Sequence, residues 1–225
     1  QLAQAHHQSE VRQSVCATLR EFMACPVDMV APCVAGEAGQ PLLLALVAKA
    51  RKAFVDRFVP EFLAIHSEIT GGAEDVTLEL TTMITDDGAE VEAKMVAAQD
   101  EDRRLRRTTV GVHKDDVVFK LDGHPLKRFG SQGQQKSFLL ALRLAQLSFI
   151  EEATGVKPIL LLDDIFDKID EKRVEALMKR VTNGSFGQVF ITDTHLGRIP
   201  DMFAATGADV RVFEVGRGEI APLTP

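Results

Sequence analysis

The sequence has no long hydrophobic run and few cysteines. Its longest apolar stretch, residues 42–48, is far shorter than the roughly 20 residues that a membrane-spanning helix needs, and no secretory signal is visible. The three cysteines, Cys16, Cys25 and Cys33, form no C-x-x-C pair and meet no zinc-ligand spacing. These absences predict a reduced cytoplasmic protein that does not enter a membrane and whose cysteines are small buried side chains.

Positive charge is also scarce, because 26 Lys and Arg face 33 Asp and Glu, for a net charge of −7. The surface as a whole therefore does not suit nucleic acid, whose phosphates need concentrated cations. One local cluster stands out, made of Arg103, Arg104, Arg106 and Arg107. It directly follows the acidic residues 100–102, so a DNA-binding patch and a solvated face of paired charges are both open.

The phosphate-binding motif G-x-x-x-x-G-K-[ST] is missing. Its backbone amides cradle nucleotide phosphates and its Lys reaches the β and γ oxygens. None of the sixteen glycines is followed by Lys, and the nearest imitation, residues 130–137, has its glycines at the wrong offsets. The first residue is Gln rather than Met. We expect a trimmed or fragmentary product that carries only half of a nucleotide site.

What is present is enough for a large core, since the chain has 225 residues of which 45% are hydrophobic. Apolar spacing predicts helices over residues 11–23 and 42–65, with Pro60 kinking the second or starting a new one and Gly71-Gly72 ending it. Residues 1–72 are expected to form a helical arm. It carries no catalytic groups of its own.

From residue 73 to 225 the pattern changes to alternating strands and helices, which is typical of an α/β head domain. We predict strands over 76–80, 108–112, 117–121, 159–162, 188–192 and 210–215. The predicted helices cover 91–107, 130–153, 171–181 and 199–205. The turn signal Asp122-Gly123 follows the third strand.

The strand over 159–162 is followed by two adjacent carboxylates, Asp163 and Asp164. A strand that is apolar at every position is expected to be covered on both faces, as parallel strands are. Ligands gather at the carboxyl ends of such strands, and carboxylate oxygens suit Mg²⁺ bound to nucleotide phosphates. The pair therefore reads as the second half of a P-loop NTPase signature, the alternative being a carboxylate that caps the next helix.

Residues 130–135, Gly-Ser-Gln-Gly-Gln-Gln, lead into the long helix predicted to end near residue 153. Ser131 is a candidate N-cap, and free amides at a helix start bind anions. Alone, this is equally an ordinary capped helix. A Ser-x-Gly-Gln helix start about 28 residues before an apolar strand ending in Asp-Asp is, however, the layout of ABC-type ATPases, in which the signature loop precedes Walker B.

With these motifs the chain resembles the RecF family of DNA replication and repair ATPases, which are relatives of the SMC proteins. The matching stretches are residues 108–116 (TTVGVHKDD), 127–137 (KRFGSQGQQKS), 157–170 (KPILLLDDIFDKID) and 186–194 (FGQVFITDT). The resemblance is to the carboxyl-terminal portion of the family. It implies an ABC/SMC-like ATPase head, of which this chain would form the C-terminal lobe. That lobe would have a P-loop NTPase type sheet with helices, and the α-helical arm would be attached to it.

The resemblance also implies roles for individual residues. The signature loop of one subunit would contact the γ-phosphate of ATP held by another, within a homodimer around two nucleotides. Asp163 would hold Mg²⁺ and Asp164 would orient or deprotonate the attacking water. The signature-loop, D-loop and switch-loop residues that would contact ATP are Ser131, Gln132, Gly133, Gln134, Asp167, Asp170 and Thr192. Asp170 is equally a candidate N-cap, and His195 is not expected to be catalytic.

The family implies ATP-dependent DNA binding and recombination mediation in gap repair linked to the SOS response. The implied partners are single-stranded or gapped duplex DNA and recombination mediator proteins, with no membrane. Without a Walker A loop this chain should be inactive alone. The alternative is a non-enzymatic DNA-binding or scaffold module that uses the arm and the arginine cluster. An Asp-rich Mg²⁺ nuclease is a weaker third option, because no further clustered acids or His complete a two-metal site.

Overall fold

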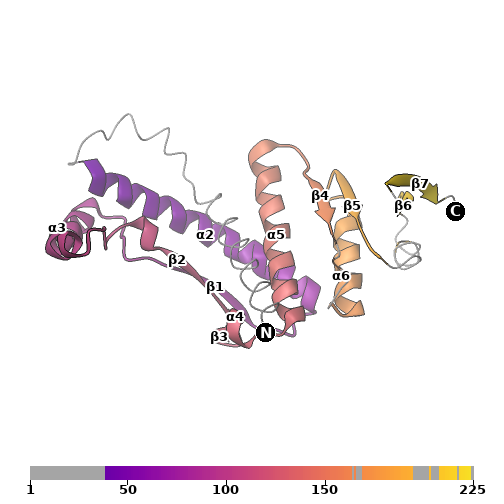
Figure 1. Ribbon diagram of the computed structural model, residues 1–225, viewed down its shortest axis with the longest axis horizontal. Helices are drawn as coiled ribbons and strands as arrows, with labels where there is room; N and C mark the ends of the chain where they lie inside the picture. The colour runs from indigo at the N-terminus through magenta and orange to yellow at the C-terminus, as the bar shows by residue number, and fades with distance from the viewer. Residues whose placement is uncertain are drawn as a thin grey trace. The chain divides into compact units, whose positions relative to one another are not determined.

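The computed structural model describes residues 39–163, 165, 169–194, 203, 208–216 and 218–223 (Figure 1). They fall into two compact units. Unit 1 contains residues 39–64 and 74–130, and unit 2 contains residues 65–73 together with the described residues from 131 onward. The helix predicted over residues 11–23 and nearly all of the one predicted over 199–205 lie outside the described residues, as do Asp164, Asp167 and His195. A domain boundary at residue 72 stays a prediction.

Unit 1 combines helices with a small antiparallel sheet. Strand β1 pairs antiparallel with β2, with Val76 opposite Leu121, and β2 also pairs antiparallel with β3, which follows it after a tight turn. Asp122 and Gly123 form the turn with positive φ values of 50° and 76°, as the sequence predicts. The elements are α2 (Gln40–Thr70), β1 (Val76–Thr81), α3 (Gly88–Leu105), the 3-10 helix η4 (Val112–Lys114), β2 (Asp116–Leu121), β3 (His124–Pro125) and α4 (Leu126–Phe129).

Helix α2 runs without interruption through Pro60 and ends at Gly71-Gly72. Both glycines have positive φ, at 67° and 71°, a conformation that other residues adopt at a steric cost. A new helix therefore does not begin at Pro60, whereas the predicted stop is confirmed. The first part of α2 belongs to unit 1 and its last residues to unit 2. None of the helices in the described ranges combines the length and apolar character that crossing a lipid bilayer requires.

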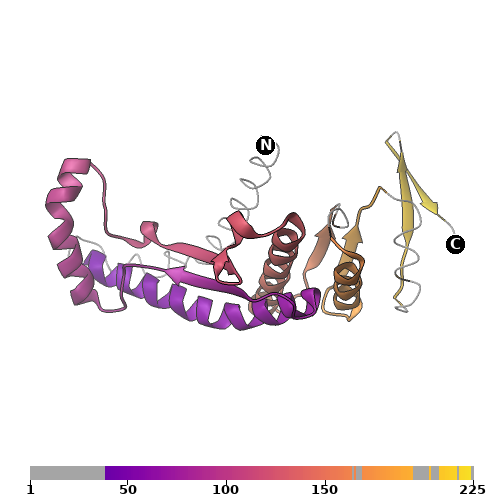
Figure 2. The same ribbon diagram turned by 90° about the horizontal axis from the view of Figure 1, so that it is seen from below.

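The β1–β2 ribbon lies alongside α2, which both views show (Figure 2). Val76 and Leu78 are buried on one face of β1, whereas Glu79 on the other face is exposed. A hydrogen bond and ion pair from Lys120 on β2 lower the pKa of Glu79. Strand alternation thus gives the ribbon one apolar and one charged face.

The strand predicted over residues 108–112 is wrong. The chain there makes bends and then the 3-10 helix η4. The reason is local: Thr109 donates its amide and its hydroxyl to the Asp102 carboxylate at 2.8 and 2.6 Å, which ties the segment to α3. Gly111 then adopts a φ of 153°. Side-chain hydrogen bonds to the backbone therefore win over the β propensity of Thr and Val.

Unit 2 holds the α/β part. Helix α5 begins directly after Ser131. Strands β4 and β5 pair in parallel, with Ile159 opposite Gln188, and the antiparallel hairpin β6–β7 is the last described part of the chain. The elements are α5 (Gln132–Thr154), β4 (Ile159–Leu162), α6 (Glu171–Thr182), β5 (Gln188–Ile191), β6 (Val212–Gly216) and β7 (Glu219–Leu223). The predicted strand over 159–162 is confirmed, and the helix predicted over 171–181 differs by one residue. Strand β7 was not predicted.

Only one face of the parallel pair is covered. Leu160 and Leu162 are 6% and 5% exposed, whereas Ile159 and Leu161 are 60% and 71% exposed, and Phe190 on β5 is 50% exposed. The expectation that β4 is covered on both faces is wrong for this chain. Leu161 lies opposite Phe190 in the register, so the three side chains share one face, which we call the open sheet face. No described element covers it.

Candidate functional site

The first part of the candidate site is the beginning of α5. Ser131 is the N-cap: its hydroxyl accepts the amide of Gln134 at 3.3 Å, and the Gln134 side chain accepts the amide of Ser131 at 2.9 Å. This reciprocal pair is a capping box. It fixes the direction in which the chain enters the 23-residue helix. The predicted N-cap is therefore confirmed.

The capping box leaves this helix end usable for an anion. Ser131 and Gln132 are exposed, and Gly133 and Gln134 are half-buried. Amides in the first turn of a helix have no partner within the helix, and they sit at the positive end of the helix dipole. Contact with ATP stays a prediction for these four residues.

The second part lies where the parallel pair β4–β5 ends. Asp163 follows β4 and Thr192 follows β5, and the Thr192 hydroxyl donates to the Asp163 carboxylate. The Thr192 amide donates to the carbonyl of Leu162 at 2.9 Å, which extends the strand pairing by one residue. Both side chains are exposed. Two residues that are 29 positions apart in the sequence are thus brought together at the carboxyl edge of the sheet, where ligands of α/β sheets bind.

The third part is the start of α6, where Asp170 is the N-cap. Its carboxylate accepts the amide of Arg173 at 3.0 Å and pairs with the Arg173 guanidinium at 2.7 Å. The same guanidinium donates at 2.9 Å to the hydroxyl of Ser137, a fully buried residue of α5. The capping role predicted for Asp170 is confirmed. Through Arg173 it is also connected to the helix that Ser131 begins.

The arginine cluster belongs to unit 1 and divides into two pairs. Arg103 and Arg104 lie in the last turn of α3 and form ion pairs with Asp100 and Glu101, each at 3.4 Å. Arg106 is the left-handed C-cap of the helix, with a φ of 52°, and Arg107 follows it. The sequence left a DNA-binding patch and a paired face open. All four arginines are exposed, and the first two form ion pairs, whereas the last two form none with another described residue.

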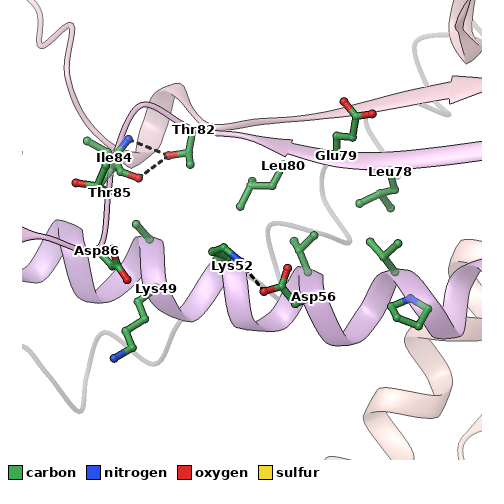
Figure 3. Close-up of a pocket in the computed structure, with 14 residues that line it drawn as sticks. Lys49, Lys52, Asp56, Leu78, Glu79, Leu80, Thr82, Ile84, Thr85 and Asp86 are labelled. Atoms are coloured by element: carbon green, nitrogen blue, oxygen red, sulfur yellow. Dashed lines mark hydrogen bonds and ion pairs between the residues drawn. The ribbon is translucent and has the colours of Figure 1, made fainter. Parts of the chain in front are cut away.

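A groove in unit 1 lies between α2 and β1 and has a volume of about 710 Å³. Figure 3 shows Leu78 and Leu80 pointing from β1 toward α2, with Lys52 and Asp56 joined by an ion pair on the helix side. None of the residues predicted to bind nucleotide or DNA lines this groove. In the part of the chain that the structure describes, no three His, Cys, Asp or Glu side chains cluster as metal ligands.

Comparison with known proteins assigns the family. No model of a known protein family matches the chain. The "DNA replication and repair protein RecF" of Flavobacterium johnsoniae is 44% identical over 165 residues, which cover 73% of this chain and 45% of that protein. The protein of the same name from Parabacteroides distasonis is 40% identical over 178 residues, covering 79% and 48%. The chain belongs to the RecF family. It matches the carboxyl-terminal part of its relatives and spans about half of their length.

The RecF assignment agrees with the fold. The recombination mediator protein RecF-ATPrS in the RecFOR pathway has been solved, and it superposes with a TM-score of 0.61 at 20% identity. The superposition covers 99% of this chain and 58% of the solved one. A structure of RecF-ATP gives the same TM-score at 18% identity. The expected ABC/SMC-like ATPase-head fold is therefore confirmed.

Sequence reasoning missed two residues that connect α5 and α6 beside the candidate site, Ser137 and Arg173. A signal for each was available. Ser137 is the one hydroxyl in the buried stripe of α5 that otherwise contains Phe138, Ala141 and Leu142, and a hydroxyl in an apolar stripe needs a hydrogen-bond partner. Arg173 stands three residues after Asp170, a spacing that places the two side chains together at a helix start. Which residue would reach Ser137 from another helix was not readable from spacing.

We expect Arg173→Ala to lower the free energy of unfolding by about 2 kcal/mol, because it removes a charged donor from a buried hydroxyl and a partner from Asp170. Denaturant unfolding followed by circular dichroism measures it. The matched control is Lys179→Ala on the same helix. The ion pair of Lys179 with Glu175 is exposed, so its loss should change stability little. In a double-mutant cycle with Ser137→Ala, additive losses would contradict the link between the two helices.

Proposed function

We propose that this chain is the carboxyl-terminal half of a RecF-type ATPase that acts on DNA during replication and repair in the cytoplasm. In this proposal the protein binds single-stranded or gapped duplex DNA in an ATP-dependent manner, assists recombination mediator proteins in gap repair linked to the SOS response, and hydrolyses ATP at the interface of a homodimer. The Walker A loop comes from a portion that these 225 residues do not contain. The chain alone does not turn over ATP.

The observation that carries this proposal is the contact of Thr192 with Asp163 at the carboxyl edge of the parallel pair. A carboxylate and a hydroxyl meet there on the ends of neighbouring strands, which is where α/β folds bind phosphate-bearing ligands. In the ABC-type layout these positions belong to Walker B and the switch loop. Asp164, the proposed catalytic base, is the next residue after Asp163, but it lies outside the described residues.

Magnesium fits this donor set. Mg²⁺ binds nucleotide phosphates and keeps several waters, and it needs only one or two protein oxygens. Asp163 is exposed and already oriented by Thr192, so its carboxylate can hold the ion directly or through water. When bound, the ion would neutralise charge on the β and γ phosphates. In this proposal Asp163 would hold the ion, Thr192 orients the Asp163 carboxylate, and Asp164 accepts a proton from the attacking water.

The open sheet face supports the proposal that another portion of the protein packs against it. Ile159, Leu161 and Phe190 are at least half exposed, although parallel sheets are normally covered on both faces. The part that this chain matches makes up only about half of each relative. In the proposal, a Walker A-bearing portion packs on this face and brings its phosphate loop toward Asp163. A chain that needs this portion has no complete nucleotide site of its own.

The test is Mg²⁺-dependent ATP hydrolysis by this chain alone and after mixing with a separately made, Walker A-bearing amino-terminal portion of a RecF relative. We expect activity only in the mixture. The Asp164→Asn variant should reduce it by at least about 100-fold, as loss of a general base does. Leu161→Asp, placed on the open sheet face, should prevent the two portions from associating in size-exclusion chromatography.

A mixture that associates but shows no Mg²⁺-dependent hydrolysis would contradict the ATPase proposal. The second candidate would then lead, a DNA-binding scaffold in which the ATPase motifs serve only the fold. Ser131 and Asp170 would then serve only as the helix caps that they already form. Salt-dependent DNA binding by the chain, together with an inactive mixture, would support the scaffold.

A further inference from the structure

The segment between α3 and β2, residues 106–114, is held firmly to its surroundings at both ends; we call it the cationic loop. At its beginning the carboxylate of Asp102 accepts the amide and the hydroxyl of Thr109 at 2.8 and 2.6 Å. The Asp102 carbonyl accepts the amide of Arg107 at 3.2 Å. The first half of the loop is thus fastened to the last turns of α3.

The second half of the loop is fastened to α2. Arg51 donates to the carbonyl of Val112 at 2.7 Å and to the carboxylate of Asp115 at 2.6 Å. The Asp115 side chain is 2% exposed. These contacts span more than 60 residues of sequence, so they fix the loop relative to the main helix of unit 1. A loop anchored at both ends loses little conformational entropy when a ligand binds it.

The loop also folds onto itself. The Nε2 atom of His113 lies 3.2 Å from the carbonyl of Thr108, which brings the 3-10 helix beside the loop's first residues. Gly111 sits between them with a φ of 153°, and a Cβ atom there would lie 2.7 Å from the His113 ring. Only glycine fits this crossing without a shift. The loop therefore presents its side chains from one compact turn.

The anchoring contacts bind the acidic side chains of this region and leave the basic side chains of the loop exposed. The carboxylate of Asp102 binds Thr109, and the carboxylate of Asp115, which is almost fully buried, binds Arg51. Arg106, Arg107 and Lys114 are exposed, and none of them makes an ion pair with another described residue. The arginines of the preceding turn differ, because Asp100 and Glu101 accompany them. The sequence is close to neutral here, but the outer surface of the loop is positive.

We infer that the cationic loop is a phosphate-contacting surface for the DNA backbone, with Arg106, Arg107 and Lys114 making the contacts and the paired Arg103 and Arg104 contributing little. This inference rests on the proposed function for the choice of DNA as partner. Guanidinium groups suit phosphate geometry, and contacts to phosphates position a protein without reading sequence. The loop exposes no large apolar side chain, which a protein interface would need at its centre.

The test compares two double variants of the 225-residue chain that have the same composition and net charge. Arg106→Gln with Arg107→Gln removes two loop cations, and Arg103→Gln with Arg104→Gln removes two paired ones. Binding to a fluorescently labelled gapped duplex is measured by anisotropy over a series of salt concentrations. We expect the loop variant to bind roughly tenfold more weakly with a salt slope reduced by about 2, and the control to stay within about twofold.

Lys114→Gln alone should reduce the slope by about 1, and the loss should be the same for duplexes of unrelated sequence. None of these changes touches Arg51, Asp102 or Asp115, so unchanged circular dichroism is expected. Equal losses in the two double variants would overturn the inference, and so would a loop variant that binds like the original chain. If the original chain binds DNA neither alone nor, with ATP, in the mixture with the amino-terminal portion, both the inference and the DNA partner of the proposed function fail, whereas the ATPase mixing experiment is unaffected.

Discussion

Replacing Ser131 with Asp should reduce ATP hydrolysis in the reconstituted mixture by at least about 100-fold while leaving the fold intact. The size follows from the effect of losing one well-placed donor at a developing charge, which is on the order of 10²–10³. Aspartate caps a helix as well as serine does, and its charge is favourable at a helix start. The same charge repels the phosphate that the proposal places at this helix end.

Two further changes at this position separate capping from phosphate contact. Ser131→Thr keeps the hydroxyl and should retain most activity, whereas Ser131→Arg should abolish activity by filling the phosphate position and should also lower stability by about 1 kcal/mol through loss of the cap. Each variant is assayed for unfolding and for hydrolysis. Undiminished hydrolysis by Ser131→Asp or Ser131→Arg would remove Ser131 from the site.

The outcome at Ser131 bears on why the structure shows a complete capping box there. A cap uses one amide of the four that a helix start leaves open. The remaining amides of the first turn can still face an anion. A helix start can therefore be satisfied without ligand and still bind one, so the capped geometry by itself favours neither the ATPase nor the scaffold.

Local signals made much of this fold predictable. The apolar residues 159–162 gave a strand with the correct ends, and Gly71-Gly72 gave the end of α2. The N-cap roles of Ser131 and Asp170 followed from residue type and spacing. In each case the signal lies within a few residues of the structure that it determines, so neighbouring side chains and backbone groups suffice to produce it.

The failures involve partners that lie outside the segment whose structure was predicted. Residues 108–112 have β propensity, but Thr109 binds Asp102 and Val112 binds Arg51, and neither partner is visible from the segment itself. The open sheet face failed as a prediction for another reason. The apolar residues of β4 indicate burial on both faces, but the element that would cover the second face is not among the described residues. An apolar strand pattern indicates that both faces of the strand are suited to burial. It does not indicate which chain supplies the covering element.

Breaking the buried ion pair between Arg51 and Asp115 should cause the largest loss of stability in unit 1. We expect Asp115→Ala to lower the free energy of unfolding by about 3 kcal/mol, because it leaves a guanidinium that is 18% exposed without its carboxylate. The chain has no Trp or Tyr, so unfolding in urea is followed by circular dichroism. Because the chain forms two units, the transition that shifts should be that of unit 1.

Lys52→Ala is the matched control. Lys52 neighbours Arg51 on α2 and pairs with Asp56 at 2.7 Å, but both side chains are more than half exposed, so we expect little loss of stability. Replacing both buried partners, with Arg51→Met and Asp115→Leu, should cost less than Asp115→Ala alone, since no buried charge is then left unpaired. If Asp115→Ala and Lys52→Ala cost the same, the buried pair does not stabilise unit 1.

The same Asp115 variant separates two explanations of DNA binding by the cationic loop. If net charge alone decides affinity, removing a carboxylate should strengthen binding, because the chain becomes less negative. If the anchored shape of the loop decides it, losing the Arg51–Asp115 contact should weaken binding although every loop cation is still present. Weaker binding with an unchanged salt slope would indicate that the phosphate contacts still form but that more order must be imposed to make them. We expect this second result, because the anchors from α2 and α3 give the loop its shape before any ligand arrives.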